Sequence, residues 1–244
     1  MLPPVPQMLL VQSRVRAQGR WGLRVVAEQR LIDAFAANPD NPYLVSFPRA
    51  GSHWLRMVLE LYFERPTLVR AFYYPGRTDY LLLHTHDIDL NVERRDVIYL
   101  YRDPVDTVYS QLSYHQEDFH DEARIRHWSD LYGRHLDKWL CQERFTTHKT
   151  ILTYEGLQNN LVGEFVKVTT HLGETLDQAR LDRVASQVTK EEVKRKTAHD
   201  PQVMQLSDQY QVTRELFREK YGDLVWQLVT EGRPHLTTYF ADQK

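Results

Sequence analysis

The chain has 244 residues, of which 42% are hydrophobic and 26% are charged, a composition typical of a globular protein with one sizeable core. The formal net charge is −2, which excludes a broad basic surface for a nucleic acid polymer, so any bound anion needs a local site. Cys141 is the single cysteine, which excludes an internal disulfide and favours a reducing, cytoplasmic location.

The sequence predicts one folded domain without a membrane span. No apolar run reaches the roughly 20 residues that a membrane-crossing helix needs, and residues 1–11 contain prolines and lack a basic start. We expect a loose arm and a helical lead-in over residues 1–42. A single α/β domain should cover residues 43–232, followed by a peripheral tail over residues 233–244.

The stretch from Tyr43 to Arg56 reads as a buried strand, a tight polar loop and a helix. An apolar run is broken by a loop with proline and glycine, and apolar residues return at helical spacing from Trp54 onwards. The first amides of a helix lack internal partners and carry the positive end of the helix dipole. The layout predicts a phosphate or sulfate site, with Arg49 as cation, Gly51 for close approach and Ser52 as hydroxyl donor.

This loop has two alternative interpretations. A nucleoside-triphosphate P-loop requires G-x-x-x-x-G-K-[ST], whereas this loop is shorter, contains one glycine and places His53 directly after Ser52. It is therefore not a Walker A motif. An ordinary strand-to-helix turn capped by Ser52 remains open, because such caps are common.

An aromatic segment and a short strand follow this helix. Four aromatic residues surround Pro75-Gly76 and either wall a substrate pocket or pack a long loop onto the core: Phe72, Tyr73, Tyr74 and Tyr80. Residues 81–83 form a short apolar strand that runs into His84 and His86. Zinc usually takes three or four placed ligands, so this bare His-x-His pair fits a single general base better than a metal site.

A second strand-to-helix junction contains an arginine and a serine. The clearest strand, residues 97–101, ends at Arg102, and Pro104 occupies the permitted first turn of a helix. Asp106 and Ser110 lie four residues apart on one face of that helix, so Ser110 can point back toward Arg102. This predicts a second anion site. A simple ion pair between Arg102 and Asp106, with a solvent-exposed serine, is the alternative.

The remaining chain contains one more strand and several helices. The strand covers residues 149–153 and is followed by Tyr154. Apolar spacing predicts helical segments over residues 128–139, 161–172, 181–188, 190–196 and 213–229. Because strands alternate with helices, we expect an α/β fold with a central, mainly parallel sheet flanked by helices.

Four segments, in this order and spacing, resemble the sulfotransferase family that uses 3′-phosphoadenosine 5′-phosphosulfate (PAPS): Phe47–Trp54, Thr85-His86, Arg102–Ser110 and Tyr154–Leu157. Each motif alone is weak, whereas four in register are specific. The resemblance covers roughly residues 43–175, and a weaker similarity continues to about residue 226. It implies a single-domain, P-loop-like sulfotransferase architecture, with PAPS as co-substrate and 3′-phosphoadenosine 5′-phosphate (PAP) as product.

The resemblance also implies which residues bind the donor. The family loop that holds the 5′-phosphosulfate corresponds to Arg49, Ala50, Gly51, Ser52 and His53. By the same resemblance, Trp54 would stack on adenine and Tyr154 would contact it. The 3′-phosphate would be bound by Arg102 and Ser110, which keep the family's interval of eight residues.

The family's catalytic histidine corresponds to His86, with His84 in the place of a lysine. A neutral imidazole suits a general base for in-line sulfuryl transfer to a hydroxyl of a small-molecule or carbohydrate acceptor, without a metal. Arg49 would stabilise charge on the leaving phosphate, and Glu60 is the reserve base. Five residues are expected to line the acceptor pocket: Phe72, Tyr73, Tyr74, Tyr114 and His115.

The sequence departs from the family pattern in two places. Arg49 replaces a lysine, which exchanges a compact ammonium for a planar fork, and Ala50 and His53 lack hydroxyls. The family's carboxy-terminal Arg-Lys-Gly…Gly segment closes over the 3′-phosphate, and residues 199–212 contain no counterpart. Arg195 or Lys196 is expected to substitute for it.

Two alternative functions remain beside sulfuryl transfer. One is a magnesium-dependent phosphotransferase of related P-loop architecture, with Asp103 at the strand end as a metal ligand. The other is a nucleotide-binding protein that has lost transfer activity, which the missing carboxy-terminal segment suggests. The identity of the acceptor and the oligomeric state are open at this point.

Overall fold

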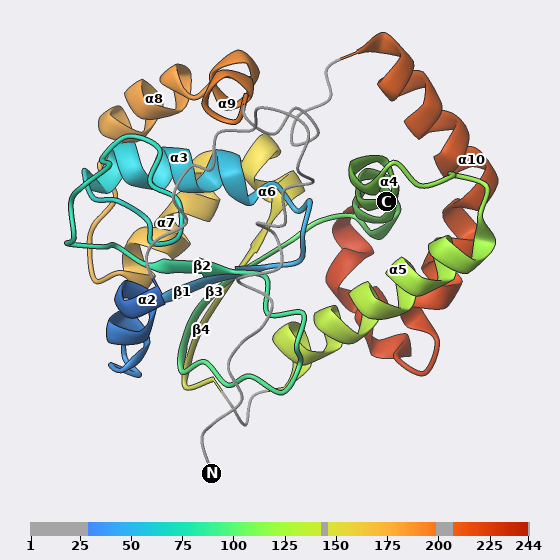
Figure 1. Cartoon of the computed structure of the whole chain (residues 1–244), viewed down its shortest axis with the longest axis horizontal. Coiled ribbons are helices and arrows are strands. Elements are labelled where there is room, and N and C mark those ends of the chain that lie inside the picture. Colours follow the sequence, from blue (N-terminus) through green and yellow to red (C-terminus); the bar gives the residue numbers. More distant parts are fainter. Residues whose placement is uncertain (1–28, 143–145, 199–206, 244) are drawn as a thin grey trace.

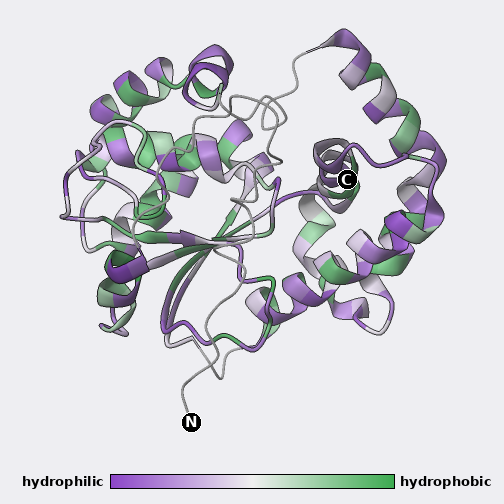
Figure 2. Cartoon of the chain, viewed as in Figure 1, coloured by the Kyte–Doolittle hydropathy of each residue, from purple (hydrophilic) through white to green (hydrophobic). Residues whose placement is uncertain are grey.

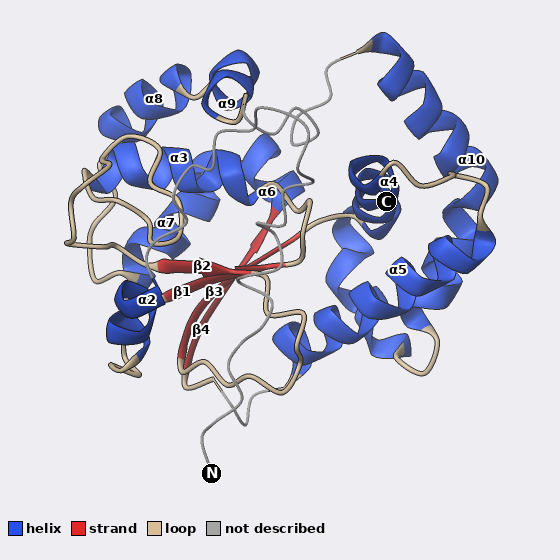
Figure 3. Ribbon diagram, in the orientation of Figure 1, coloured by secondary structure: helices blue, strands red, loops and turns tan. Residues whose placement is uncertain are grey.

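The computed structural model describes residues 29–142, 146–198 and 207–243, and it shows a sheet between two layers of helices (Figure 1). The strands, at the centre of Figure 3, are parallel and lie in the order β2-β1-β3-β4. Their bounds are β1 (Tyr43–Ser46), β2 (Leu83–Thr85), β3 (Asp96–Tyr101) and β4 (His148–Thr153). The expected α/β fold is confirmed. The predicted arm and the predicted helical turns before residue 29 lie outside the described residues.

The strand residues face two separate hydrophobic cores. Because β1 and β3 are buried on both faces, they read as continuous apolar runs rather than as alternating patterns. One core packs beneath α4 (Pro104–His115), α5 (Glu122–Leu136) and α10 (Asp208–Thr230). The other packs beneath α3 (Ser52–Phe63), α7 (Leu161–His171) and α8 (Gln178–Gln187). Figure 2 shows hydrophobic and hydrophilic residues mixed along these helices, as expected of amphipathic elements.

The shorter elements complete the two layers. They are α2 (Gln29–Ala36), the π-helical turn η1 (Asp137–Cys141), α6 (Tyr154–Asn159), α9 (Lys190–Lys196) and the 3₁₀ segment η2 (Pro234–Gln243). Within the described ranges, no helix combines the length and the apolar character that a bilayer crossing requires.

The segment after Gly232 is not the peripheral tail predicted from the sequence. Leu236 is fully buried and Phe240 is 1% exposed, and both belong to the core beneath α10. Tyr101 Oη donates a hydrogen bond to the carbonyl of Tyr239 at 2.8 Å. The prediction failed because two isolated apolar residues carry no periodicity.

The carboxyl ends of the four parallel strands meet at one edge of the sheet. β1 leads into the loop before α3, β2 leads into His86, β3 leads into the start of α4, and β4 leads directly into α6. Ligands of open parallel sheets bind at this edge, where strand-to-helix loops converge. The fold therefore brings together all four segments on which the resemblance rests.

Candidate functional site

The start of α3 has no side-chain cap. Gly51 is the N-cap residue, and within the described residues α3 has no side-chain cap hydrogen bond to its first amides. Ser52, the cap in the simpler interpretation of this loop, is instead the first residue of the helix and is 4% exposed. In contrast, every helix from α4 to α10 begins at a residue whose side chain accepts an amide hydrogen bond. The amides of α3 are thus directed at a position that suits an anion.

Gly51 is required at this loop for two reasons. Its φ is 92°, in the left-handed region that favours glycine. A Cβ atom at this position would lie 2.5 Å from Cδ2 of Tyr154, which is the first residue of α6. The Tyr154 ring therefore lies directly on the loop. Arg102 lies on the same ring, with its Cζ 4.5 Å from the ring centroid.

Arg49 connects the two predicted anion sites. Its Nε donates a hydrogen bond to Ser110 Oγ at 3.0 Å, and its Cζ lies 5.0 Å from the centroid of the Tyr114 ring. Ser110 is 3% exposed, so it is not the solvent-exposed serine of the simpler interpretation. Arg49 also has a φ of 75°, a conformation uncommon outside glycine and typical of functional loops. The loop that follows β1 and the helix that follows β3 thus meet through one side-chain contact.

Arg102 has a buried donor without a protein acceptor. Its Nη2 pairs with Asp106 Oδ2 at 3.1 Å, and its Nη1 donates to the carbonyl of Arg49 at 3.4 Å. Within the described chain, its Nε has no hydrogen-bond partner, although that atom is buried. Buried donors are nearly always satisfied in folded proteins. An orphaned guanidinium N–H beside the Gly51 loop therefore fits an anionic ligand.

Two arginines from α10 complete this charge cluster, and the sequence reasoning missed them. Arg218 Nη2 lies 2.8 Å from both Asp103 Oδ1 and Asp106 Oδ1, and Arg214 Nη1 lies 3.8 Å from Asp106 Oδ2. Burial alone would raise the pKa of Asp106, but Arg102, Arg218 and Arg214 together lower it below its ordinary value. The carboxylates of Asp103 and Asp106 are thus paired with three guanidinium groups.

The residues expected to replace the missing carboxy-terminal segment lie elsewhere. Arg195 pairs with Glu192 at 2.7 Å on the exposed side of α9. Lys196 Nζ donates to the carbonyl of Phe72 at 2.7 Å and lies 4.3 Å from the Tyr73 ring centroid. Among the residues that the structure describes, neither side chain makes a hydrogen bond or an ion pair with Arg102 or Ser110. The spacing of Arg214 and Arg218 by four residues, on one face of α10, was the available signal.

His86 is held in one tautomer beside the loop. Its Nδ1 donates to the carbonyl of Ser46, the last residue of β1, at 2.8 Å, so that Nε2 carries the lone pair. The side chain is half-buried. Burial lowers the pKa of His86 to about 4, although the hydrogen bond to Ser46 acts against this shift. His86 is therefore neutral at physiological pH and can accept a proton at Nε2.

Buried polar residues fix the position of His86. His135 Nε2 donates to the carbonyl of His86 at 2.8 Å, and its Nδ1 lies 2.9 Å from Tyr99 Oη. Burial lowers the pKa of His135 to about 3, so this donor stays neutral. His84 lies 3.4 Å from Ser46 Oγ and 3.4 Å from Arg56 Nη1, and burial also lowers its pKa. Both ring nitrogens of His84 and Nδ1 of His86 thus lie within hydrogen-bonding distance of protein groups.

Glu60 anchors a loop instead of facing the reaction edge. It is fully buried, and its two oxygens accept hydrogen bonds from the amides of Thr67, Phe72 and Tyr73 and from the Thr67 hydroxyl, at 2.6 to 3.1 Å. With both oxygens engaged in this way, Glu60 has no accessible lone pair for an acceptor hydroxyl. Its position argues for a structural role and against its use as the reserve base.

The other residues expected to bind the donor border the loop. Ala50 is fully buried, and His53 Nε2 lies 3.1 Å from Arg70 Nη1. Burial, together with Arg56 and Arg70, lowers the pKa of His53 well below its ordinary value. Trp54 Nε1 donates to the carbonyl of Val188 at 2.9 Å, so its ring packs toward α8.

The five residues expected around the acceptor have different surroundings. Phe72 packs edge-on against His53, with ring centroids 5.8 Å apart, and Tyr114 lies beside Arg49. Tyr73 Oη donates to Glu192, and Tyr74 lies beneath Arg77. His115 stacks on Trp128. Phe72 and Tyr114 are thus the two of this set that contact loop residues of the donor site.

Asp103 is used as a helix cap. Its Oδ1 accepts a hydrogen bond from the Asp106 amide at 3.0 Å and pairs with Arg218. An aspartate engaged with an amide and a guanidinium is a poor match to the magnesium ligand that the phosphotransferase alternative requires.

Comparison with known families places this geometry in context. The profile of one protein family, described as "Sulfotransferase domain", matches residues 84–242, which is more than half of the chain. The mouse protein "Sulfotransferase 6B1" is 24% identical over 194 residues, or 66% of this chain. The chain spans 64% of the length of that curated relative.

Solved sulfotransferase structures share the fold. A crystal structure of mouse sulfotransferase SULT7A1 complexed with PAP has a TM-score of 0.58 at 15% identity, covering 90% of this chain and 95% of that chain. A structure of retinol dehydratase in a complex with retinol and PAP has a TM-score of 0.56 at 15% identity, covering 79% and 81% of the two chains. The family match begins at His84, so the roles of the Gly51 loop rest on the contacts described above.

Proposed function

Because this chain belongs to the sulfotransferase domain family, we propose that it transfers a sulfuryl group from PAPS to a hydroxyl group of a small-molecule acceptor. The observation that carries this proposal is the position of Arg49 between the two anion sites. Its Nε donates a hydrogen bond to Ser110 Oγ, and its carbonyl accepts one from Arg102, whose Nε is orphaned. Arg49 itself lies in the loop before the uncapped start of α3. PAPS carries phosphate groups at two ends. The start of α3 with Arg49 could bind one end, and the neighbouring pair of Arg102 and Ser110 could bind the other.

The two ends of PAPS are assigned to residues on two sides of the site. On the α3 side, the first amides and Arg49 suit the phosphosulfate, with Gly51 leaving room for close approach. On the α4 side, Arg102 and Ser110 suit the 3′-phosphate. Arg218 and Arg214 supply the positive charge that the absent carboxy-terminal segment would give. Trp54 and Tyr154 remain our candidates for contacts with adenine.

His86 is the proposed general base. Its Nε2 takes the proton of the acceptor hydroxyl while the acceptor oxygen bonds to sulfur and the bond from sulfur to the leaving phosphate oxygen breaks in line. Arg49 and the α3 amides stabilise the charge that develops on that phosphate. A bound phosphosulfate brings negative charge near the imidazole, which raises its pKa from the low value set by burial and so strengthens the base.

The acceptor is proposed to be a small molecule with an apolar or aromatic body. Phe72 packs against His53, and Tyr114 lies beside Arg49. Such rings supply apolar contact area around a reacting hydroxyl. The retinol dehydratase structures contain retinol in one case and androsterone in another, both of which fit this description. A carbohydrate acceptor is the competing class.

The direct test combines binding and turnover. Calorimetry should detect PAP binding without magnesium, and transfer from PAPS to a panel of phenols, apolar alcohols and sugars should persist in the presence of a chelator. Transfer from ATP that stops on chelation would instead support a phosphotransferase. PAP binding without turnover on any acceptor class would reject the enzyme and support a binding protein.

A further inference from the structure

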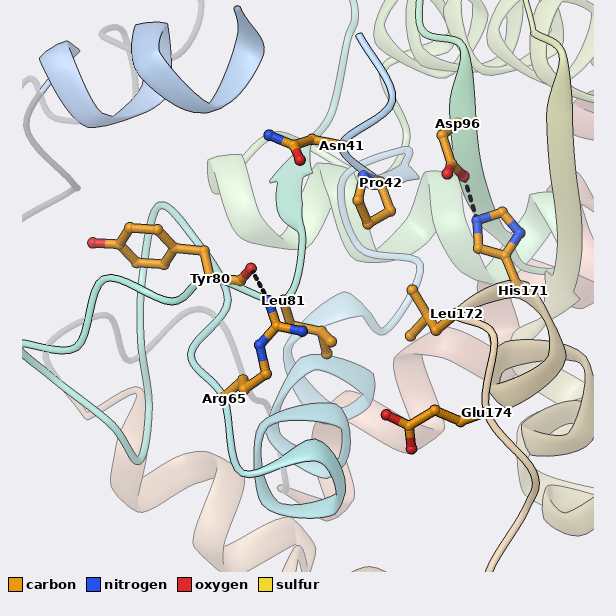
Figure 4. A pocket seen from close by; sticks show the side chains of 9 residues that line it. All are labelled: Asn41, Pro42, Arg65, Tyr80, Leu81, Asp96, His171, Leu172 and Glu174. Atoms are coloured by element: carbon orange, nitrogen blue, oxygen red, sulfur yellow. Dashed lines mark hydrogen bonds and ion pairs between the residues drawn. The ribbon is translucent and has the colours of Figure 1, made fainter. Parts of the chain in front are cut away.

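A second cluster of polar residues lies at the opposite edge of the sheet, where the strands begin. Asp96 is the first residue of β3, His148 is the first residue of β4, and the two are partners in the strand register. His171, the last residue of α7, faces Asp96 in Figure 4. Asp96 and His171 line a pocket of about 260 Å³ at this edge. β3 separates this cluster from the donor site by its full length of six residues, roughly 17 Å.

Three ligand-type atoms converge in this cluster. His171 Nε2 lies 2.5 Å and His148 Nδ1 lies 3.3 Å from the same carboxylate oxygen, Asp96 Oδ1. The two imidazole rings are nearly parallel, at an angle of 5° with centroids 4.0 Å apart. The His171 side chain is fully buried, that of Asp96 is 20% exposed and that of His148 is 54% exposed.

The contact between Asp96 and His171 is not an ordinary hydrogen bond. Among the residues that the structure describes, neither Asp96 Oδ1 nor His171 Nε2 has a hydrogen-bond partner, although both atoms are buried and only 2.5 Å apart. A proton on His171 Nε2 would therefore not point at the carboxylate. Two buried atoms with lone pairs that face one another without a proton between them repel, unless a cation lies between them.

A neighbouring hydroxyl selects the tautomer that a metal ligand needs. His171 Nδ1 lies 2.9 Å from Oγ1 of Thr150, on β4. When Nδ1–H donates to this oxygen, Nε2 carries the lone pair and points toward Asp96. Metal-binding histidines are oriented by such a hydrogen bond from their other ring nitrogen.

We propose that Asp96, His148 and His171 bind a divalent transition-metal ion of the zinc class. Two imidazoles and one carboxylate are ligands that zinc accepts, and a pocket at the site leaves room for solvent as a fourth ligand. Zinc bonds of about 2.0–2.2 Å place neighbouring tetrahedral ligands roughly 3.3 Å apart. The separation between Asp96 and His148 already matches, and His171 needs to withdraw by under about 1 Å.

The proposed ion is structural. It would join the starts of β3 and β4 to the end of α7, at an edge that no residue of the donor site reaches. Ion binding should therefore stabilise the folded chain without being required for transfer.

Another group of possible metal ligands provides a comparison with the Asp96 cluster. Asp137, Cys141 and His235 also lie within ligand distance of one another. However, His235 Nε2 makes a regular hydrogen bond to Asp137 Oδ1 at 2.7 Å, and burial raises the pKa of the Cys141 thiol, which disfavours the thiolate that zinc binds. We therefore assign the metal to the Asp96 cluster.

The test uses the full chain, free of affinity tags and previously dialysed against a chelator. Titration with Zn²⁺ alone should give one ion per chain by calorimetry and a rise in melting temperature, and Co²⁺ should give visible absorption of a low-coordinate site. His148→Ala changes a half-exposed side chain, so it should fold, and it should weaken binding at least about tenfold. Asp96→Asn should do the same, and His235→Ala should have no effect.

Three results would overturn the proposal: no Zn²⁺-dependent heat or thermal shift, an affinity unchanged in both His148→Ala and Asp96→Asn, or loss of binding in His235→Ala instead. Because PAP binding is measured separately, failure here leaves the proposed transfer activity untouched.

Discussion

The starts of α3 and α4 lie at the same edge of the sheet, and they are built in opposite ways. At α3, Gly51 leaves the first amides without a side-chain acceptor. At α4, Asp103 caps the Asp106 amide, and both carboxylates are paired with arginines. An anion at α3 is thus offered backbone N–H groups, whereas an anion at α4 must be bound by the side chains of Arg102, Ser110 and the α10 arginines. Anion binding at the α3 side should therefore weaken when the backbone is disturbed. Anion binding at the α4 side should weaken when a side-chain charge is removed.

The largest effect is expected for His86→Ala. This variant tests whether the proton of the acceptor hydroxyl is removed by His86, next to the α3 side. General-base catalysis contributes about 10²–10⁴ to the rate, so kcat should fall by roughly that factor. PAP affinity should change less than about twofold, because the histidine contacts Ser46 and not the phosphate-binding groups. The exposed His127→Ala is the matched control. Near-normal kcat in His86→Ala would remove His86 as the base.

Acid should destabilise the surroundings of the proposed base, because His86 and its neighbour His135 are both held neutral. Burial lowers the pKa of His86 to about 4 and of His135 to about 3, both well below the unfolded value of about 6.5. The unfolded chain therefore binds more protons between pH 6.5 and 4, so stability is fully present above about pH 6.5 and is lost as the pH falls. Each histidine should contribute a slope of up to about 1.4 kcal/mol per pH unit to the free energy of unfolding.

Denaturant unfolding at pH 7, 6 and 5 measures this slope. His135→Gln keeps an amide donor for the His86 carbonyl but removes one titrating group. The slope of the free energy of unfolding should therefore fall by up to about 1.4 kcal/mol per pH unit, whatever the stability of the variant at pH 7. A free energy of unfolding that is independent of pH over this range would contradict the neutral, buried state of these histidines.

Gly51→Ala disturbs the backbone of the α3 side without changing any charge. The new Cβ would lie 2.5 Å from the Tyr154 ring, and alanine is strained at a φ of 92°. We expect PAP affinity to fall about 10- to 100-fold, corresponding to roughly 1–3 kcal/mol of strain. Gly76→Ala is a close control, since Gly76 has a φ of 89° but no atom within 4 Å of the added Cβ. Equal losses of PAP affinity in both variants would contradict the role of the contact with Tyr154.

Local patterns predicted the sheet and the strand, loop and helix around Gly51 well. Apolar runs followed by Pro or Arg gave β1 and β3 within one or two residues at each end, because these parallel strands are buried on both faces. The edge strand β4, which is only partly buried, was also predicted within one residue at each end. β2 covers Leu83–Thr85 rather than residues 81–83. This shift reflects polar burial: His84 lies in the strand because Ser46 and Arg56 lie within hydrogen-bonding distance of it, and no apolar pattern reports such contacts.

Long-range contacts explain the rest of what the sequence did not predict. Arg218 reaches Asp103 across 115 residues, and the burial of Leu236 and Phe240 depends on α10 folding back onto the sheet. Glu60 looked like a spare base because its four donors come from a loop that follows it in the chain. Such roles depend on tertiary packing, which residue spacing does not encode.

The smallest effect is expected for Arg218→Ala, which removes charge from the α4 side alone. Arg218 is 46% exposed and shares Asp106 with Arg102 and Arg214, so its loss leaves two cations in place and should weaken PAP binding about 3- to 10-fold. The weakening should shrink at high salt, because exposed charges are screened, whereas the loss in Gly51→Ala should not. Arg195→Ala removes the same charge from the exposed side of α9 and should leave PAP affinity unchanged. If Arg195→Ala weakened PAP binding and Arg218→Ala did not, the 3′-phosphate would be bound near α9. The claim that side chains around the start of α4 bind this phosphate would then be wrong.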